Sequence, residues 1–159
     1  MDQMAMADPV RLAVSSDSPF QLLDLTERVA GVVAGAGLHH GIVHVFCPHT
    51  SCGLAVTELE DGLHADFEGA LARLAPVDGE YAHDDMGRRR QNLEPDERHN
   101  GWSHIRGLLA TQPAVSAPIL DGALALGRWQ RLFLVELDGP RPERTVVVQC
   151  WGAAGSAAW

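Results

Sequence analysis

The alternation of apolar and polar positions along the chain predicts a series of short strands. Side chains of a strand point alternately to its two faces, so a period of two marks a strand with one buried face. Residues 41–47 are apolar on both faces and predict a central strand, and Asp121-Gly122 is the strongest short hairpin signal. The predicted strands are residues 11–14, 20–23, 41–47, 49–58, 114–120, 123–126, 131–138 and 145–151.

Apolar residues at helical spacing predict two longer helices. The first begins beside Asp24 and Glu27, an acidic cap with a glutamate three residues on, and runs to about Ala36. The second begins at Asp61 and ends before Pro76, because proline cannot continue a helix. In the second helix we expect a core face at Leu63, Phe67, Leu71 and Leu74, and a solvent face at His64, Asp66 and Glu68.

A long polar segment and a short helix follow. Residues 75–101 predict a loop, and loops of this length in small domains are usually functional or disordered. The arginines at 88–90 are expected to form a solvated face. Ser103 can cap a short helix that ends at Ala110, with His104 in its first turn pointing elsewhere and with a buried face formed by Ile105, Leu108 and Leu109.

The order of these elements predicts the fold class. Strands and helices do not alternate regularly, which points to an α+β domain on a largely antiparallel β-sheet or sandwich with two to three helices. A length of 159 residues suits one domain. We expect a flexible N-terminal tail at residues 1–9 and a single domain at residues 10–159.

Composition and charge narrow the classes of function. With 46% hydrophobic and 21% charged residues, the chain has the composition of a globular protein. The formal net charge of −9 argues against nucleic acid and an anionic membrane as partners. All 12 basic residues are arginine, which excludes Schiff-base chemistry and a phosphate-loop lysine. Neither a secretory pattern nor a long apolar run is present, so we expect a cytoplasmic protein.

Cysteine usage agrees with that compartment. Cys47, Cys52 and Cys150 are odd in number and lack the CxxC spacing of metal sites. They are therefore expected to be small buried hydrophobic side chains in reducing surroundings.

A strand with polar groups at both ends is the centre of the candidate chemistry. Residues 49–58 begin with His49, Thr50 and Ser51 and finish with Glu58. Imidazole nitrogen suits zinc, nickel or iron, and a carboxylate can complete the metal shell or act as a base. In the alternative interpretation, His49 and Thr50 cap a turn and Glu58 ends a strand in solvent. The spacing of these residues is not diagnostic of any one kind of site. Further candidates are His83, Asp84, His104 and Glu136. We interpret His44 as a core or interface group and do not include it in the site.

The motifs of the chain, taken together, resemble those of the YjbQ family. Its members are also called secondary thiamine-phosphate synthase enzymes. The match runs in one register from about Arg11 to Gly152. It rests on His49-Thr50-Ser51, Leu54, Glu58, Tyr81-x-His83-Asp84, Ser103-His104-Ile105, Asp121-Gly122-x-Leu124-x-Leu126-Gly127-x-Trp129-Gln130 and Glu136.

The resemblance implies a YjbQ-like α+β fold, a homotrimer, and a site between subunits for a small phosphorylated substrate. It also implies a weak activity that joins a pyrimidine diphosphate to a thiazole phosphate. A divalent metal, zinc or magnesium, would be held by His49, His83 and His104; without a metal, these histidines would donate to a phosphate. Catalytic roles would fall to Glu58, Asp84 and Glu136, with Asp84 holding magnesium or orienting His83, and substrate binding to Thr50, Ser51, Arg106, Arg128, Trp129 and Gln130.

Three features depart from the family pattern. Thr57 stands where members commonly have asparagine, the segment 88–101 is longer than in short members, and Trp102 could line the mouth of the site. Two other functions fit the same residues. One is a metal-dependent hydrolase of a small ester or amide, and the other is a non-enzymatic trimer that binds an anion or ligand.

Overall fold

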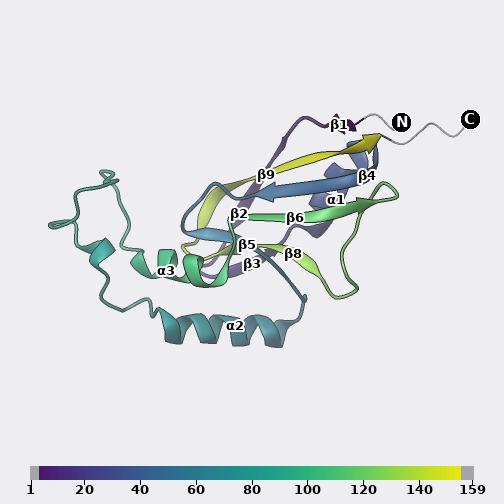
Figure 1. Ribbon diagram of the computed structural model, residues 1–159. Helices are drawn as coiled ribbons and strands as arrows, with labels where there is room; N and C mark the ends of the chain where they lie inside the picture. Colours follow the sequence, from purple (N-terminus) through teal and green to yellow (C-terminus); the bar gives the residue numbers. More distant parts are fainter. Residues whose placement is uncertain (1–3, 155–159) are drawn as a thin grey trace, which may run out of the picture.

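The strand pairings divide the β-structure into two antiparallel sheets. The computed structural model describes residues 4–154 (Figure 1). The larger sheet has the order β1-β9-β4-β6-β7, with β2 also paired to β9, and the smaller sheet has the order β3-β8-β5. The strands are β1 (Met4–Met6), β2 (Val10–Ser16), β3 (Gln21–Asp24), β4 (Leu38–Phe46), β5 (Cys52–Thr57), β6 (Ala114–Leu120), β7 (Ala123–Leu124), β8 (Arg131–Glu136) and β9 (Arg141–Ala154).

Three helices and one short turn complete the chain. They are α1 (Thr26–Gly35), α2 (Asp61–Leu74), α3 (Gly101–Ala110) and the 3-10 turn η1 (Ala82–Asp84). The expected α+β class with a largely antiparallel sheet is confirmed. None of these helices in residues 4–154 is long and apolar enough to cross a membrane.

Two hydrophobic cores hold the layers together. The first lies between the two sheets and α1, where Leu54 of β5 meets Val43 of β4 and Val33 of α1. The second lies on the other face of the smaller sheet, where Val135 packs with Leu71 of α2. Cys52, Leu54 and Val56 all lie on the side of the first core, while Ala55 faces the second, as the period of two predicts.

Part of the N-terminal segment expected to be a flexible tail, residues 1–9, forms a strand, β1. Met4 lies opposite Ala153 and Met6 lies opposite Trp151. The long strand β9 offers unpaired backbone groups beyond the end of β2, and β1 satisfies them. Residues 1–3 are outside the described part of the chain.

The predicted helix positions are confirmed, but several predicted helix faces are wrong. On α2, Leu71 is buried whereas Leu74 is 65% exposed, and His64 packs edge-on against Phe133 instead of facing solvent. The N-cap of α2 is Glu60, whose carboxylate accepts hydrogen bonds from two backbone N–H groups.

Helix α3 buries a different side from the expected one. Its buried side chains are Trp102, Ser103 and Arg106, and its N-cap is Asn100. The expected core residues Ile105, Leu108 and Leu109 are exposed, Leu108 by 83%. The cause is the guanidinium of Arg106, which stacks on Trp102 and donates to the carbonyl of Ala75, and so turns the polar side of the helix inward.

Candidate functional site

Two of the predicted histidines lie side by side at the junction of η1 and α3. The ring centroids of His83 and His104 are 4.5 Å apart. The two residues are 21 positions apart in the chain, and their approach depends on how η1 docks on α3. We refer to them as the histidine pair.

Asp84 supports this docking. Its Oδ1 atom accepts hydrogen bonds from the backbone N–H groups of Asn100 and Gly101, both at 3.0 Å. These are orphan donors at the start of α3, where a carboxylate is also favoured by the helix dipole. At Gly101 a Cβ atom would lie 2.5 Å from Cβ of Tyr81, so glycine permits the close approach. Asp84 therefore acts as a helix cap for α3.

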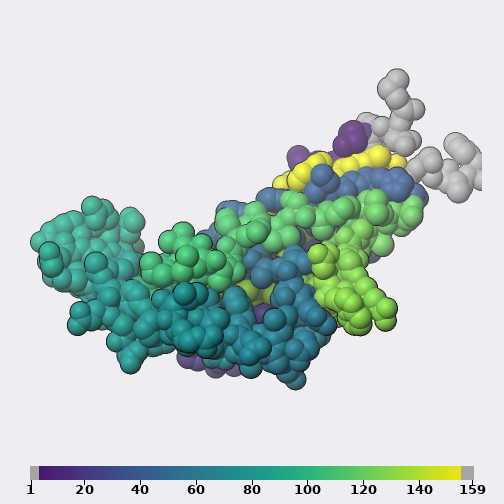
Figure 2. All heavy atoms as spheres, turned by 60° about the horizontal axis from the view of Figure 1, so that its bottom comes forward, coloured from purple at the N-terminus to yellow at the C-terminus, as the bar shows by residue number. Residues whose placement is uncertain are grey.

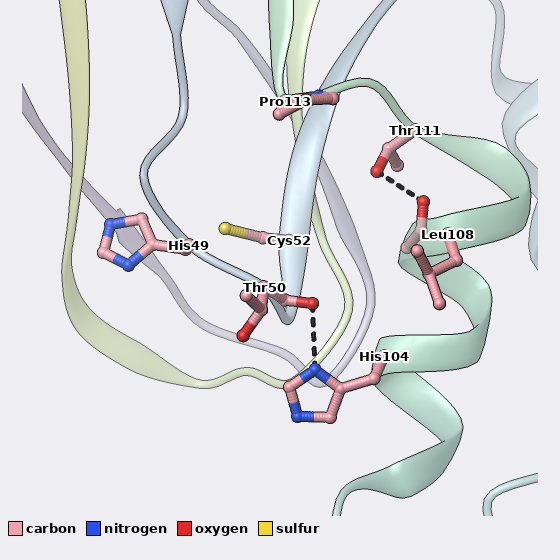
Figure 3. A pocket seen from close by; sticks show the side chains of 8 residues that line it. His49, Thr50, Cys52, His104, Leu108, Thr111 and Pro113 are labelled. Atoms are coloured by element: carbon pink, nitrogen blue, oxygen red, sulfur yellow. Dashed lines mark hydrogen bonds between the residues drawn. The ribbon is translucent and has the colours of Figure 1, made fainter. Parts of the chain in front are cut away.

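The tautomer of His104 is fixed by the backbone. Its Nδ1 atom lies 3.0 Å from the carbonyl oxygen of Thr50, and a carbonyl only accepts, so Nδ1 donates (Figure 3). In the neutral ring, Nε2 then carries the lone pair. This places a proton acceptor beside a cavity of about 460 Å³, which we call the His104 cavity. It is lined by His49, Thr50, Cys52, His104, Gly107, Leu108, Thr111 and Pro113.

His83 borders a second and more polar cavity of about 560 Å³, the His83 cavity. Arg89 lies with Nη1 3.3 Å from Nε2 of His83 and 2.9 Å from the carboxylate of Glu97. Burial lowers the pKa of His83, and the neighbouring His104 and Arg89 lower it further. The lowered pKa favours the neutral form of His83. The cavity is lined by Ala82, His83, Asp85, Arg88, Arg89 and Gln91.

His49 lines the His104 cavity but is not part of the histidine pair. Figure 3 shows its ring on the other side of Thr50 from His104. Its Nε2 atom accepts a hydrogen bond from the N–H of Thr145 at 2.9 Å. Burial and then Arg144 lower the pKa of His49. Among residues 4–154, His49, His83 and His104 do not gather their donor atoms around one point, so a three-histidine metal site does not fit the single chain.

Glu136 belongs to a buried ion pair beneath this region. Its side chain is fully buried, and Arg144 donates two hydrogen bonds of 2.7 Å to its carboxylate. The backbone N–H groups of Leu137 and Asp138 donate to the same carboxylate. Burial disfavours the charged form of Glu136, but Arg144 and these N–H groups outweigh it and lower its pKa. An ionised carboxylate with this many donors has little capacity to take a proton.

Ser51 is also drawn into the ion pair. Its hydroxyl accepts a hydrogen bond of 3.1 Å from Arg144, and the residue is buried. Thr50 is exposed, and it contributes its carbonyl to His104 and its side chain to the cavity. Of the two hydroxyl residues expected to bind substrate, Ser51 is thus buried beside the ion pair and Thr50 lines the His104 cavity.

The remaining predicted site residues lie apart from the histidine pair. Glu58 follows the far end of β5 and is exposed. Arg106 is buried against Trp102, as described above. Arg128 stacks on Trp129 in the β7–β8 loop, and Gln130 closes a turn by accepting the N–H of Gly127. Figure 2 shows this yellow-green loop and the teal α2–α3 segment projecting from opposite ends of the molecule.

Two contributors to the site were not predicted. Arg144 meets Glu136 across the β8–β9 hairpin, and Arg89 meets Glu97 within the long loop, although arginines 88–90 were expected to be solvated. In the sequence, each of these ion pairs is visible only as two opposite charges a few residues apart. Exposed ion pairs on the surface show the same pattern, so the sequence could not single out these two. The three cysteines are buried thiols, as expected, and Cys52 also borders the His104 cavity.

The fold and these cavities define an α+β protein with a candidate small-molecule site where a loop joins a helix. The chain belongs to the UPF0047 protein YjbQ-like family, whose model matches residues 10–153. A UPF0047 protein of Methanothermobacter thermautotrophicus is 34% identical over 124 residues, which cover 78% of each chain. A UPF0047 protein of Archaeoglobus fulgidus is 30% identical over 138 residues, covering 87% of this chain and 98% of the relative.

Solved structures agree with the family assignment. The crystal structure of a YbjQ-like protein of unknown function from Sulfolobus solfataricus superposes with a TM-score of 0.83 at 27% identity, covering 94% of this chain and 99% of the other. A conserved hypothetical protein from Thermus thermophilus has a TM-score of 0.66 at 38% identity, with 87% and 97% covered. These relatives establish the fold and the family.

Proposed function

We propose that the chain is an enzyme that acts on a small phosphorylated molecule at the histidine pair. The observation that carries the proposal is that a fixed imidazole borders one cavity and its neighbour borders another that contains arginines. The Nε2 atom of His104 can accept a hydrogen bond from a substrate in the His104 cavity. Arg88, which is 89% exposed, can bind a phosphate in the His83 cavity.

We propose that the reaction is the formation of thiamine phosphate. In it a pyrimidine diphosphate loses pyrophosphate as a thiazole phosphate attacks, so negative charge on the leaving group must be stabilised. Within one chain, Arg88 and Arg89 are better candidates for this role than Arg106 and Arg128, because Arg106 is buried and the Arg128 of the same chain lies in a distant loop. A divalent cation at His49, His83 and His104 would need donors from a second copy, and no step of the proposal depends on one.

We also propose that the chain works as a homotrimer in which the β7–β8 loop of one copy approaches the histidine pair of another. Support comes from the exposed apolar residues of the outer face of the larger sheet, Ile42 at 41% and Phe46 at 39%, and of α3 beside the cavity. Grouped exposed apolar side chains are typical of interfaces. Light scattering should give three times the chain mass of 17.1 kDa, and a mass of one chain would contradict the trimer.

Complementation of a bacterial strain that lacks thiamine-phosphate synthase tests the named reaction. We expect the wild-type chain to relieve thiamine auxotrophy and His104→Ala to abolish the relief. His99→Ala is the matched control, because His99 is an exposed histidine of the preceding loop. No growth with abundant wild-type protein would contradict thiamine phosphate formation.

A binding measurement separates the enzyme from a non-enzymatic anion-binding protein. The purified chain is heated with phosphate, pyrophosphate or each thiamine precursor, since a ligand that binds the folded state raises the melting temperature. We expect pyrophosphate to stabilise the wild type and to stabilise Arg88→Ala less. Stabilisation without turnover of the precursors would favour the anion-binding protein.

A further inference from the structure

Two consecutive histidines and one aspartate meet at the edge of the larger sheet, at the other end of β4 from His49. The Nε2 atoms of His39 and His40 lie 3.7 Å and 3.8 Å from Oδ1 of Asp121. The two imidazole centroids are 4.3 Å apart. In the described residues this is the group of histidine, cysteine and acidic side chains whose donor atoms converge on one point.

A β-bulge explains how two neighbouring residues reach the same partner. On a regular strand, His39 and His40 would point to opposite faces of the sheet. Here Leu38 lies opposite Ala154 and His40 lies opposite Ala153, so His39 is an extra residue on β4. Such a bulge locally breaks the alternation and re-aims a side chain. Both imidazoles can therefore approach Asp121 together.

The turn between β6 and β7 holds the third donor in place. Asp121 and Gly122 both have positive φ, +51° and +78°, as a tight two-residue hairpin turn requires. The N–H of Gly122 donates to the carbonyl oxygen of His39 at 2.8 Å. The turn is thus hydrogen-bonded to the bulge itself, and Oδ1 of Asp121 lies near the Nε2 atoms of both rings.

We propose that His39, His40 and Asp121 form a binding site for a divalent transition-metal ion, with zinc as the reference ion. Two imidazole nitrogens and one carboxylate oxygen suit zinc, nickel or copper, whereas magnesium and calcium prefer oxygen ligands alone. In a tetrahedral zinc site with bonds of about 2.05 Å, neighbouring donors are about 3.3 Å apart. The observed nitrogen–oxygen separations of 3.7 Å and 3.8 Å would need to shorten by about 0.4 to 0.5 Å, and all three donor atoms lie within 4.8 Å of one another.

Exposure allows that adjustment and shapes the site. The side chains of His39, His40 and Asp121 are 51%, 56% and 81% exposed, so each has solvent on one side into which it can rotate. Three protein donors leave the fourth tetrahedral position for water or for a donor from another molecule. The bound ion would tie the bulge of β4 to the β6–β7 turn. The proposal uses none of the residues of the histidine pair and stands or falls independently of the proposed function.

Calorimetric titration of metal-free protein with zinc chloride tests the site. The protein should carry no histidine tag, and a chelator should be used and removed beforehand. We expect about one zinc ion per chain at this site, and a weaker affinity by at least about tenfold in His40→Ala and in Asp121→Asn, since even outer-shell changes cost this much. Asparagine tolerates the positive φ of position 121, so the turn is retained.

Two control variants make the result specific. His99→Ala removes an exposed histidine elsewhere, and the double variant His83→Ala, His104→Ala removes the histidine pair; neither should change this zinc affinity. Zinc should also raise the melting temperature of the wild type and not that of the double variant His39→Ala, His40→Ala. Undiminished zinc affinity in that last variant, or no zinc binding by the wild type, would overturn the proposal.

Discussion

The Glu136–Arg144 pair and the histidine pair contain the same kinds of groups that the sequence marked as candidate chemistry, yet their surroundings differ. Glu136 is fully buried and receives hydrogen bonds from Arg144 and from two backbone N–H groups. His104 donates through Nδ1 to Thr50 and keeps the lone pair of Nε2 at the border of a cavity. One cluster has its hydrogen-bonding capacity filled, and the other retains an acceptor that a ligand could reach.

This difference distinguishes polar groups that we expect to stabilise the fold from those that we propose to act on a ligand. A buried carboxylate paired with a guanidinium stabilises the sheet only while both partners are present, because either charge alone in the interior is costly. An imidazole at a cavity contributes less to folding and can exchange a proton with a ligand. Substitutions in the two clusters should therefore affect stability and activity in opposite proportions.

The largest effect on stability is expected from Glu136→Ala, which leaves Arg144 buried without its partner. Breaking a buried ion pair in this way costs about 3–5 kcal/mol of unfolding free energy. Urea denaturation should show the loss. Glu58→Ala, at an exposed carboxylate, is the control and should change stability by less than about 0.5 kcal/mol. A loss in Glu136→Ala no larger than that of the control would remove the structural role of the pair.

A smaller effect is expected from Asp84→Ala, which removes the acceptor for two N–H groups at the start of α3. Loss of a cap typically costs about 1 kcal/mol. Asp84→Asn keeps an acceptor oxygen and should recover most of the stability and of any activity. Asp78→Ala, at an exposed position before η1, is the matched control. Equal defects in the alanine and asparagine variants of Asp84 would argue against the capping role.

His104→Ala should cost about 1 kcal/mol or less, the net value of one hydrogen bond, and yet abolish complementation. Its effect would be large on activity and small on stability, the reverse of what we expect for Glu136→Ala. Circular dichroism and urea denaturation would show whether the chain still folds. Retained complementation by a folded His104→Ala protein would exclude His104 as the proton acceptor.

A weak pH dependence of stability is expected from the histidines. The pKa values of His49 and His83 are lowered in the folded state below the usual 6.5, mainly by burial. The unfolded chain therefore binds more protons in this range, and stability decreases as the pH falls below about 6.5. The melting temperature of wild type between pH 7.5 and 5 measures the decrease. It should be shallower in His83→Asn, and an identical profile would contradict the contribution of His83.

The smallest effect on the stability of the single chain is expected from Leu108→Ser, because Leu108 is 83% exposed. Its unfolding free energy should change by less than about 0.5 kcal/mol. The same substitution should weaken the proposed trimer, which light scattering over a dilution series would detect. Unchanged association would place the interface elsewhere.

Local patterns predicted most of the fold. The Asp121-Gly122 turn, the two faces of β5 and the bounds of α2 follow from short-range chemistry, and the structure confirms them. Faces of short helices were less predictable. In α3 a buried arginine stacked on Trp102 replaces the apolar face that Leu108 and Leu109 indicated, and only the tertiary contacts decide between these sides.

The candidate site was predictable in part. His83 and His104 were identified as candidates together with His49, but the contact between the first two depends on the Asp84 cap and on Gly101, which spacing does not show. Trp129 and Gln130 belong to one motif and lie in the β7–β8 loop, away from the histidine pair of the same chain. A motif in the sequence does not show how far apart its residues lie in the fold. The bulge at His39 was hidden because consecutive residues normally diverge.

The long strand β9 has a consequence for how the chain acquires its structure. It pairs with β1, β2 and β4, and it follows all of them in the order of synthesis. Val10 of β2 pairs with Val148 of β9. The backbone groups at the edges of β1 and β2 therefore stay unpaired until more than a hundred later residues have left the ribosome. Contacts so distant in sequence slow folding. A molecular chaperone that binds the nascent β1–β2 segment would be expected to raise the yield of folded protein.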